Sequence, residues 1–189
     1  MKNTMKLLRN CLASLLVLLI LTPQASALSP YRLRRFPKLP FTDSEINTIT
    51  NVVNGEVGGI CGSARITYAD GTQITADACL LHKIHARVVI NQVRSDMFPS
   101  TVSGCVRQCW STAYDGTSWR SSDQWQHCRG DVITALVTDI NVPSNVYAAT
   151  CDPRFAEKYA GFYLWARVDW DTGWCSGKFY YYAYDAKEN

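Results

Sequence analysis

Apolar residues recur at helical spacing in the stretch that follows Thr42. Ile46, Ile49 and Val53 are separated by three or four residues and mark one face of a helix. The Thr42 hydroxyl can cap the first free amides of this helix while the side chain of Glu45 reaches back, as in a capping box. The pattern therefore predicts a helix that begins at Thr42 and ends at the glycines of the sequence NGEVGG.

The rest of the chain shows both helical and strand-like patterns. Residues 64–77 alternate and are rich in turn formers, with Asp70-Gly71 between the two halves, which predicts a small hairpin. Helical spacing predicts a second helix over 78–94 and a third over 131–140. Beyond Pro143 aromatic residues occur among other residues that favour β-strands. We therefore expect a sheet whose aromatic rings either fill the core or line a sugar groove. The predicted fold class is α+β, with helices packed against a small antiparallel sheet.

The first residues have the organisation of a secretory signal peptide. A basic start is followed by an apolar run over 15–21 and by the small residues Ala25-Ser26-Ala27, so we assign residues 1–27 to the signal and expect cleavage before Leu28. The apolar run is shorter than the roughly 20 residues of a membrane-spanning helix. We expect a periplasmic or secreted protein with no stable membrane insertion after cleavage, and a retained signal anchor is the alternative.

Positive charge is concentrated just after the predicted signal. Three arginines and one lysine lie among the prolines of residues 28–40, which predicts a flexible basic arm. This arm is either a solvated linker or a contact for an anionic polymer. Residues 41–189 hold more acidic than basic side chains, which argues against nucleic-acid binding. Their length fits one domain, and we expect a monomer.

Cysteine usage agrees with an oxidising compartment. Removal of Cys11 with the signal would leave Cys61, Cys79, Cys105, Cys109, Cys128, Cys151 and Cys175. We expect a disulfide-stapled domain with up to three bridges and one cysteine left over. Zinc is the competing explanation, because His82, His85 and His127 add ligand types, although in no recognised spacing. We expect no metal and no other cofactor, with His82 and His85 at exposed helix positions.

Two polar residues fall on apolar helix faces and are candidates for chemistry. Glu56 follows Val53 by three residues, at the edge of the first apolar stripe. A carboxyl group partly withdrawn from water suits a general acid, which holds its proton until a leaving group needs it; a solvated helix end is the alternative. Asn91 lies three residues beyond Val88 in the second stripe, and its amide is either a structural bridge or a substrate contact.

Several short motifs occur in the order seen in a known family. They are Gly55-Glu56, the run VVINQV over 88–93, the run FPSTV over 98–102, Gln108 and the pair Trp110-Ser111. In this order they resemble the bacterial cell-wall hydrolase family typified by the spore-cortex-lytic enzyme SleB. The resemblance extends from about Phe41 over most of the chain, and Phe179-Tyr180 match its terminal aromatic pair more loosely.

The resemblance implies a lysozyme-like domain that cleaves the MurNAc-GlcNAc bonds of peptidoglycan glycan strands as a lytic transglycosylase. Glu56 would be the single catalytic acid and base. Asn91, Gln108 and Ser111 would bind sugar hydroxyls and acetamides, while Trp110 and Tyr180 would pack on sugar rings. All five also have structural explanations.

The chain departs from the family pattern at three places. Gln92 replaces the usual Arg, and Gly177 stands where a His is expected. The predicted hairpin resembles an insertion, which a Cys61–Cys79 bridge would tie down. A secreted glycan-binding protein without catalysis is therefore the alternative function. An amidase or peptidase is less favoured, because no zinc site or activated nucleophile has convincing spacing.

Overall fold

The computed structural model describes residues 41–60, 62–77, 79–116 and 122–185, all of which belong to one compact unit. The predicted signal peptide, the basic arm and Cys61 lie outside the described residues, so the expected Cys61–Cys79 bridge does as well. Within the described ranges, no helix combines the length and apolar character needed to cross a membrane.

The first two helices of the described residues follow the sequence prediction closely. Helix α2 spans Asp43–Val57, and its capping box is present: the Thr42 amide donates to Glu45 Oε2 over 2.8 Å, and the Glu45 amide donates to Thr42 Oγ1 over 3.3 Å. Helix α3 spans Cys79–Arg94. Both predicted helices are confirmed, because caps and apolar periodicity are local features of the chain.

The next helical segments differ from the prediction. Helix α4 spans Val102–Cys109 and a short 3-10 turn spans Thr112–Tyr114. Helix α5 spans Asp123–Val137, so the prediction of 131–140 is wrong at both ends. The first half of α5 is mostly polar, and only Trp125 and Cys128 on its inner side reveal a buried face.

A five-stranded antiparallel sheet forms the other half of the described unit. Its strands are β1 (Ser63–Tyr68), β2 (Gln73–Asp77), β3 (Val146–Thr150), β4 (Phe162–Asp171) and β5 (Ser176–Tyr184). Their order across the sheet is β2-β1-β4-β5-β3, and every pairing is antiparallel. The short helix α6 (Phe155–Lys158) lies between β3 and β4 in the chain. The predicted hairpin and sheet are confirmed.

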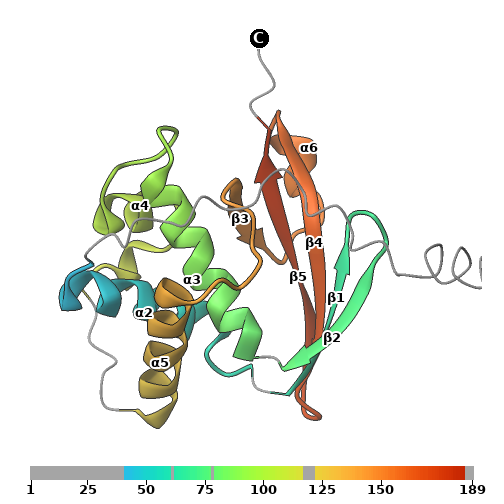
Figure 1. Cartoon of the computed structure of the whole chain (residues 1–189), viewed down its shortest axis with the longest axis horizontal. Coiled ribbons are helices and arrows are strands. Elements are labelled where there is room, and N and C mark those ends of the chain that lie inside the picture. The colour runs from blue at the N-terminus through green and yellow to red at the C-terminus, as the bar shows by residue number, and fades with distance from the viewer. Residues whose placement is uncertain (1–40, 61, 78, 117–121, 186–189) are drawn as a thin grey trace, which may run out of the picture. The chain divides into compact units, whose positions relative to one another are not determined.

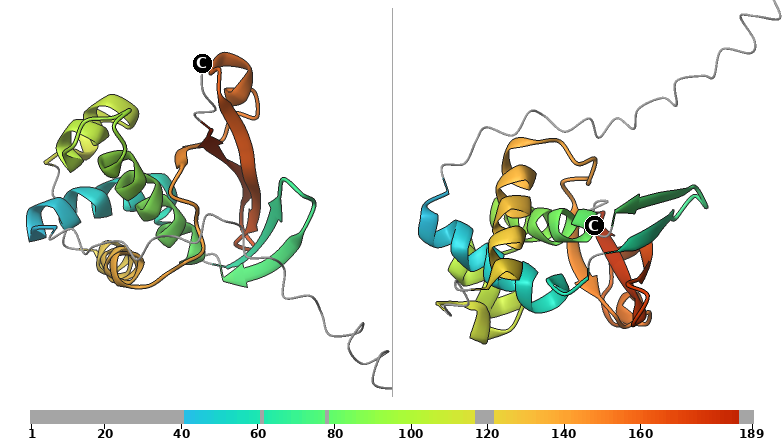
Figure 2. Two further views of the ribbon diagram at one scale, coloured as in Figure 1. Left: turned by 45° about the horizontal axis from the view of Figure 1, so that its top comes forward. Right: turned by 90° about the horizontal axis from the view of Figure 1, so that it is seen from below.

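Helices and sheet form two sides of a common core. Figures 1 and 2 show α2, α4 and α5 on one side, the sheet on the other, and the tip of the β1–β2 hairpin projecting away from the helices. Helix α3 contacts α2, α4, α5 and β3, and its His85 ring lies against Phe179 and Tyr181 of β5. The α+β class is therefore confirmed, with α3 as the central helix.

The expected disulfide stapling is not found among the described residues, since no two cysteines of these ranges are joined. Cys105 is an example of a cysteine with a packing role in place of a disulfide. Its side chain is buried in the core, its thiol donates to the Pro99 carbonyl over 2.9 Å, and burial raises its pKa to about 12. This cysteine packs as a small apolar residue.

Candidate active site

The cavity around Glu56 lies where the end of α2 meets the β4–β5 hairpin. Glu56 is half-buried in the last turn of α2, and the cavity has a volume of about 650 Å³. Its sheet side includes Trp170 on β4 together with Gly177 and Tyr180 on β5. Among the described residues that line it, Glu56 is the one carboxylate. The structure thus brings the predicted acid and the predicted aromatic Tyr180 to one cavity.

Tyr114 from the 3-10 turn holds the Glu56 carboxylate in place. Its hydroxyl donates to Glu56 Oε1 over 3.1 Å. Burial raises the pKa of Tyr114 to about 12, and the negative charge of Glu56 and the hydrogen bond add to that effect. The phenol therefore remains a hydrogen-bond donor throughout the physiological pH range.

Gly55 explains how the tyrosine ring reaches the carboxylate. A Cβ atom at position 55 would collide with the ring of Tyr114. The glycine of the Gly55-Glu56 motif therefore has a steric function: it admits the ring whose hydroxyl orients the acid. Gly177 acts similarly on the other wall, where a Cβ would lie 2.6 Å from Cζ2 of Trp170.

The Glu56 cavity continues along the sheet. A neighbouring cavity of about 550 Å³ shares Trp170, Gly177 and Lys178 with it and extends toward β1 and β2. Asp169 and Asp171 line this second cavity. Asp169 is engaged by cations on both sides, with Arg167 Nε at 2.8 Å and Lys178 Nζ at 3.5 Å. The two cavities form an extended surface suited to a polymer, with Glu56 at one end.

Gln108 and Trp110 do not share the Glu56 cavity. Both line a separate cavity of about 330 Å³, together with Phe98 of the FPSTV motif. The Trp110 indole is fixed there, because its Nε1 donates to Gln92 Oε1 over 2.9 Å. Ser111 is exposed, and its hydroxyl accepts a hydrogen bond from the Ala113 amide at the start of the 3-10 turn.

Asn91 is placed as a structural bridge and not as a surface contact. Its side chain is 1% exposed, and Nδ2 donates to the carbonyls of Pro143 and Val146 over 2.9 and 3.0 Å. These two bonds join α3 to the start of β3 and favour the structural explanation, whereas its assignment to substrate binding stays a prediction. Gln92 has a comparable role, since its Nε2 donates to the Tyr147 carbonyl over 2.6 Å.

The two histidines of α3 are both buried, so the prediction that they are exposed is wrong. Helix α3 is enclosed by other helices and by the sheet, which leaves it little solvent-facing surface. Burial lowers the pKa of His85 to about 3, so this imidazole is neutral at pH 7. Its Nδ1 lies 2.9 Å from the hydroxyl of Tyr181.

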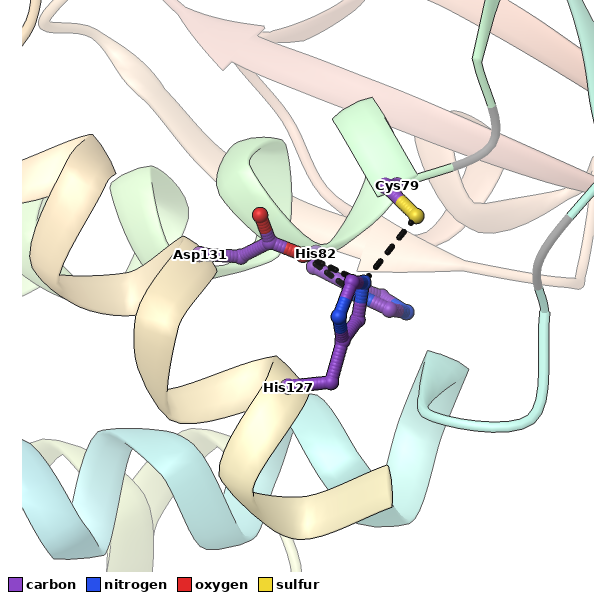
Figure 3. Close-up of side chains that lie close together, drawn as sticks. All are labelled: Cys79, His82, His127 and Asp131. Atoms are coloured by element: carbon purple, nitrogen blue, oxygen red, sulfur yellow. Dashed lines mark hydrogen bonds and ion pairs between the residues drawn. The ribbon is translucent and has the colours of Figure 1, made fainter. Parts of the chain in front are cut away.

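Four potential metal ligands gather beside the Glu56 end of α2. Cys79 and His82 lie on α3, and His127 and Asp131 lie on α5. Figure 3 shows the four side chains pointing toward one another. One ligand atom from each lies within 4.8 Å of the others. Sequence analysis missed this cluster, although the spacings Cys-x-x-His and His-x-x-x-Asp suit one face of a helix.

Sequence analysis also missed Tyr114 as part of the candidate site, whereas Trp170 is one of the aromatic residues beyond Pro143 that it left open between the core and a sugar groove. Tyr114 follows the Trp110-Ser111 pair closely in the chain, but its contact with Glu56 joins residues 58 apart.

Comparisons with protein-family models, with curated proteins and with solved structures found no match to this chain.

Proposed function

We propose that this protein cleaves peptidoglycan glycan strands as a lytic transglycosylase, with Glu56 as its single acid and base. The observation that carries the proposal is the placement of Glu56: a half-buried carboxylate, oriented by Tyr114, in a cavity with no second carboxylate among its described lining residues. The ordered sequence motifs add support, and they also suggest a lysozyme-like domain. An acid on a helix end that faces a small sheet is compatible with such a domain.

A single carboxyl group suffices for this reaction. Glycoside hydrolases use two carboxylates, either to activate a water or to form a covalent intermediate. In lytic transglycosylation the C6 hydroxyl of MurNAc attacks its own anomeric carbon and leaves a 1,6-anhydro sugar. Glu56 would first protonate the glycosidic oxygen and then, as a carboxylate, accept the proton of that hydroxyl.

The two oxygens of Glu56 divide these tasks. Oε1 accepts the hydrogen bond from Tyr114, whereas Oε2 accepts none from the described part of the chain. Oε2 is therefore the oxygen that would carry and transfer the proton. Tyr114 acts as a positioning residue, since its hydroxyl fixes the plane of the carboxylate.

Aromatic side chains provide surfaces for sugar rings next to Glu56. Trp170 and Tyr180 line its cavity, and Trp174 at the β4–β5 turn is 98% exposed beside the cavity residue Cys175. Flat aromatic rings pack well on the apolar faces of pyranoses, so these three side chains provide the platforms that the proposal requires.

Solubilisation of purified peptidoglycan sacculi tests the proposal. We expect the wild-type protein to release soluble muropeptides and Glu56→Gln to lose about 10²- to 10⁴-fold in rate, as expected for the loss of a general acid. Glu157→Gln, at an exposed position on α6, is the matched control and should retain full activity. Unchanged release by the Glu56 variant would exclude the proposed role.

A non-catalytic glycan-binding protein is the second candidate function. Gly177 in place of the family's His, and the fully exposed Trp174, favour binding over turnover. In that case the wild-type protein and Glu56→Gln would sediment with sacculi equally well, and neither would release soluble products.

A further inference from the structure

We propose that Cys79, His82, His127 and Asp131 bind a divalent transition metal ion, for which zinc is the best chemical match. The four residues come from two helices: Cys79 and His82 from the first turn of α3, and His127 and Asp131 from successive turns of α5 (Figure 3). The proposal concerns a site separate from the Glu56 cavity and does not depend on the proposed glycan cleavage.

The distances between the ligand atoms fit a small metal centre. His82 Nδ1 lies 2.8 Å from Asp131 Oδ2, and His127 Nε2 lies 3.3 Å from Cys79 Sγ and 3.5 Å from Asp131 Oδ2. Ligand atoms around a tetrahedral zinc ion are about 3.3 to 3.6 Å apart, given its usual bond lengths. All four atoms already lie within 4.8 Å of one another, so small side-chain rotations would complete the site.

The hydrogen bonds of His82 indicate which of its nitrogens faces a cation. Nε2 lies 3.0 Å from the carbonyl of Val57, and because a carbonyl only accepts, Nε2 carries the hydrogen. In the neutral ring, Nδ1 then presents a lone pair to the Asp131 carboxylate. Two electron-rich atoms at that separation need a proton or a metal ion between them. A second nitrogen that donates to a backbone carbonyl is also typical of metal-bound histidine.

A proton on His82 would explain the contact with Asp131, but it would not explain the rest of the cluster. It gives no reason for His127 and Cys79 to converge on the same point. Lys83 already neutralises the other face of the carboxylate, with Nζ 3.7 Å from Oδ1, which leaves Oδ2 directed at both histidines. A metal ion accounts for all four side chains together.

The donor set selects the class of metal. Two imidazoles, one thiolate and one carboxylate suit zinc, whereas calcium and magnesium prefer oxygen ligands alone. Four protein ligands fill a tetrahedral site, which is typical of a structural metal and leaves no open position for a substrate. The metal would fasten α3 to α5. Through the His82 hydrogen bond to Val57 it would also hold the residue next to Glu56.

Metal binding excludes a disulfide at Cys79, because the ligand is the thiolate. The expected Cys61–Cys79 bridge and the metal site are therefore alternatives for the same sulfur. Peptide mass mapping under non-reducing conditions distinguishes them.

The test uses residues 28–189, the chain expected after signal cleavage, purified without an affinity tag and incubated with Zn²⁺ or Co²⁺. We expect about one bound zinc per chain by elemental analysis, loss of that zinc to a chelator, and a higher Tm in its presence. The Co²⁺ form should show a thiolate-to-cobalt absorption band. His127→Asn and Cys79→Ser alter residues that are not fully buried. Each removes a ligand atom and not merely a residue that orients a ligand, so each should weaken metal binding at least about 100-fold.

Cys175→Ser, at an exposed cysteine outside the cluster, is the matched control and should keep both the metal and the cobalt–thiolate band. The proposal is overturned if the wild-type protein binds neither ion, if Cys79→Ser keeps the band, or if Cys79 is found in a disulfide. Each readout is a property of the metal complex, so none changes with the outcome of the peptidoglycan experiments.

Discussion

The Tyr114 hydroxyl donates a hydrogen bond of 3.1 Å to Oε1 of Glu56, and the ring that carries it occupies the space left by the missing side chain of Gly55. This contact fixes the orientation of the one carboxylate that lines the cavity among its described residues. It connects the 3-10 turn after α4 to the end of α2, so the acid is positioned by a part of the chain distant from it in sequence.

Removal of this hydroxyl should impair turnover more than binding. We expect Tyr114→Phe to lower kcat by about tenfold, because a hydrogen bond to a charged group is worth roughly 1.5 to 3 kcal/mol and part of that is recovered from water. KM and Tm should change little. Steady-state kinetics on soluble glycan fragments measure kcat and KM separately. Tyr163→Phe, at an exposed tyrosine, is the control. An unchanged kcat would contradict a positioning role.

Burial of His85 should make the protein less stable in acid. Its pKa is lowered to about 3 because the folded protein withdraws the ring from water, whereas the unfolded chain protonates near 6.5. Between these values the unfolded state binds more protons. The contribution of His85 is therefore complete above pH 6.5 and is lost as the pH falls toward 3, with a slope of up to about 1.4 kcal/mol per pH unit.

Urea unfolding at pH 7 and pH 4.5 measures that slope. His85→Gln removes the titrating group and should lose less stability over this interval than the wild-type protein. Equal losses in the two proteins would show that His85 does not contribute to acid sensitivity.

The fold was predictable from the sequence where its causes are local. The Thr42 capping box and the turn at Asp70-Gly71 involve residues a few positions apart, and both were predicted. The start of α5 was not, because its burial depends on a distant partner: the Trp125 indole donates to Asn51 Oδ1 across 74 residues. Because the neighbours of Trp125 in the sequence are polar, the buried face of this part of α5 is recognised only from the tertiary structure.

The candidate site was predictable to a similar extent. Glu56 could be identified from its place on an apolar stripe, but Tyr114 could not, because no local spacing links residues 58 apart. The burial of His82 and His85 was missed because periodicity predicts one buried face, whereas α3 is enclosed on nearly every side. The spacing of the metal-type residues is visible in the sequence, but their convergence requires two packed helices.

A substitution at Asn91 distinguishes a structural role of its amide from a role in substrate binding. Asn91→Ala removes two hydrogen bonds and leaves the carbonyls of Pro143 and Val146 without that donor, so we expect it to lower the free energy of unfolding by about 1 to 3 kcal/mol. Chemical denaturation measures the loss, and KM measured well below the melting temperature should be unchanged. A raised KM with full stability would instead favour Asn91 as a substrate contact. Gln108→Ala, at an exposed position, should leave stability unchanged.

Trp174 should contribute to polymer binding and not to folding. Its side chain is 98% exposed, so Trp174→Ala removes little buried surface. We expect several-fold to about tenfold weaker binding to sacculi, from the loss of one aromatic platform, and an unchanged Tm. Sedimentation with sacculi measures this effect. Val137→Ala, at a residue 65% exposed at the end of α5, is the control, and equal binding by all three proteins would remove Trp174 from the binding surface.

The chemical form of the released sugars tests the central claim most directly. Mass spectrometry of the soluble products from sacculi incubated with the wild-type protein should show muropeptides that end in 1,6-anhydro-MurNAc, and Glu56→Gln should yield almost none. Products with reducing MurNAc ends would contradict transglycosylation and indicate hydrolysis that uses a second carboxylate. The absence of any wild-type product, together with retained sacculus binding, would contradict catalysis itself.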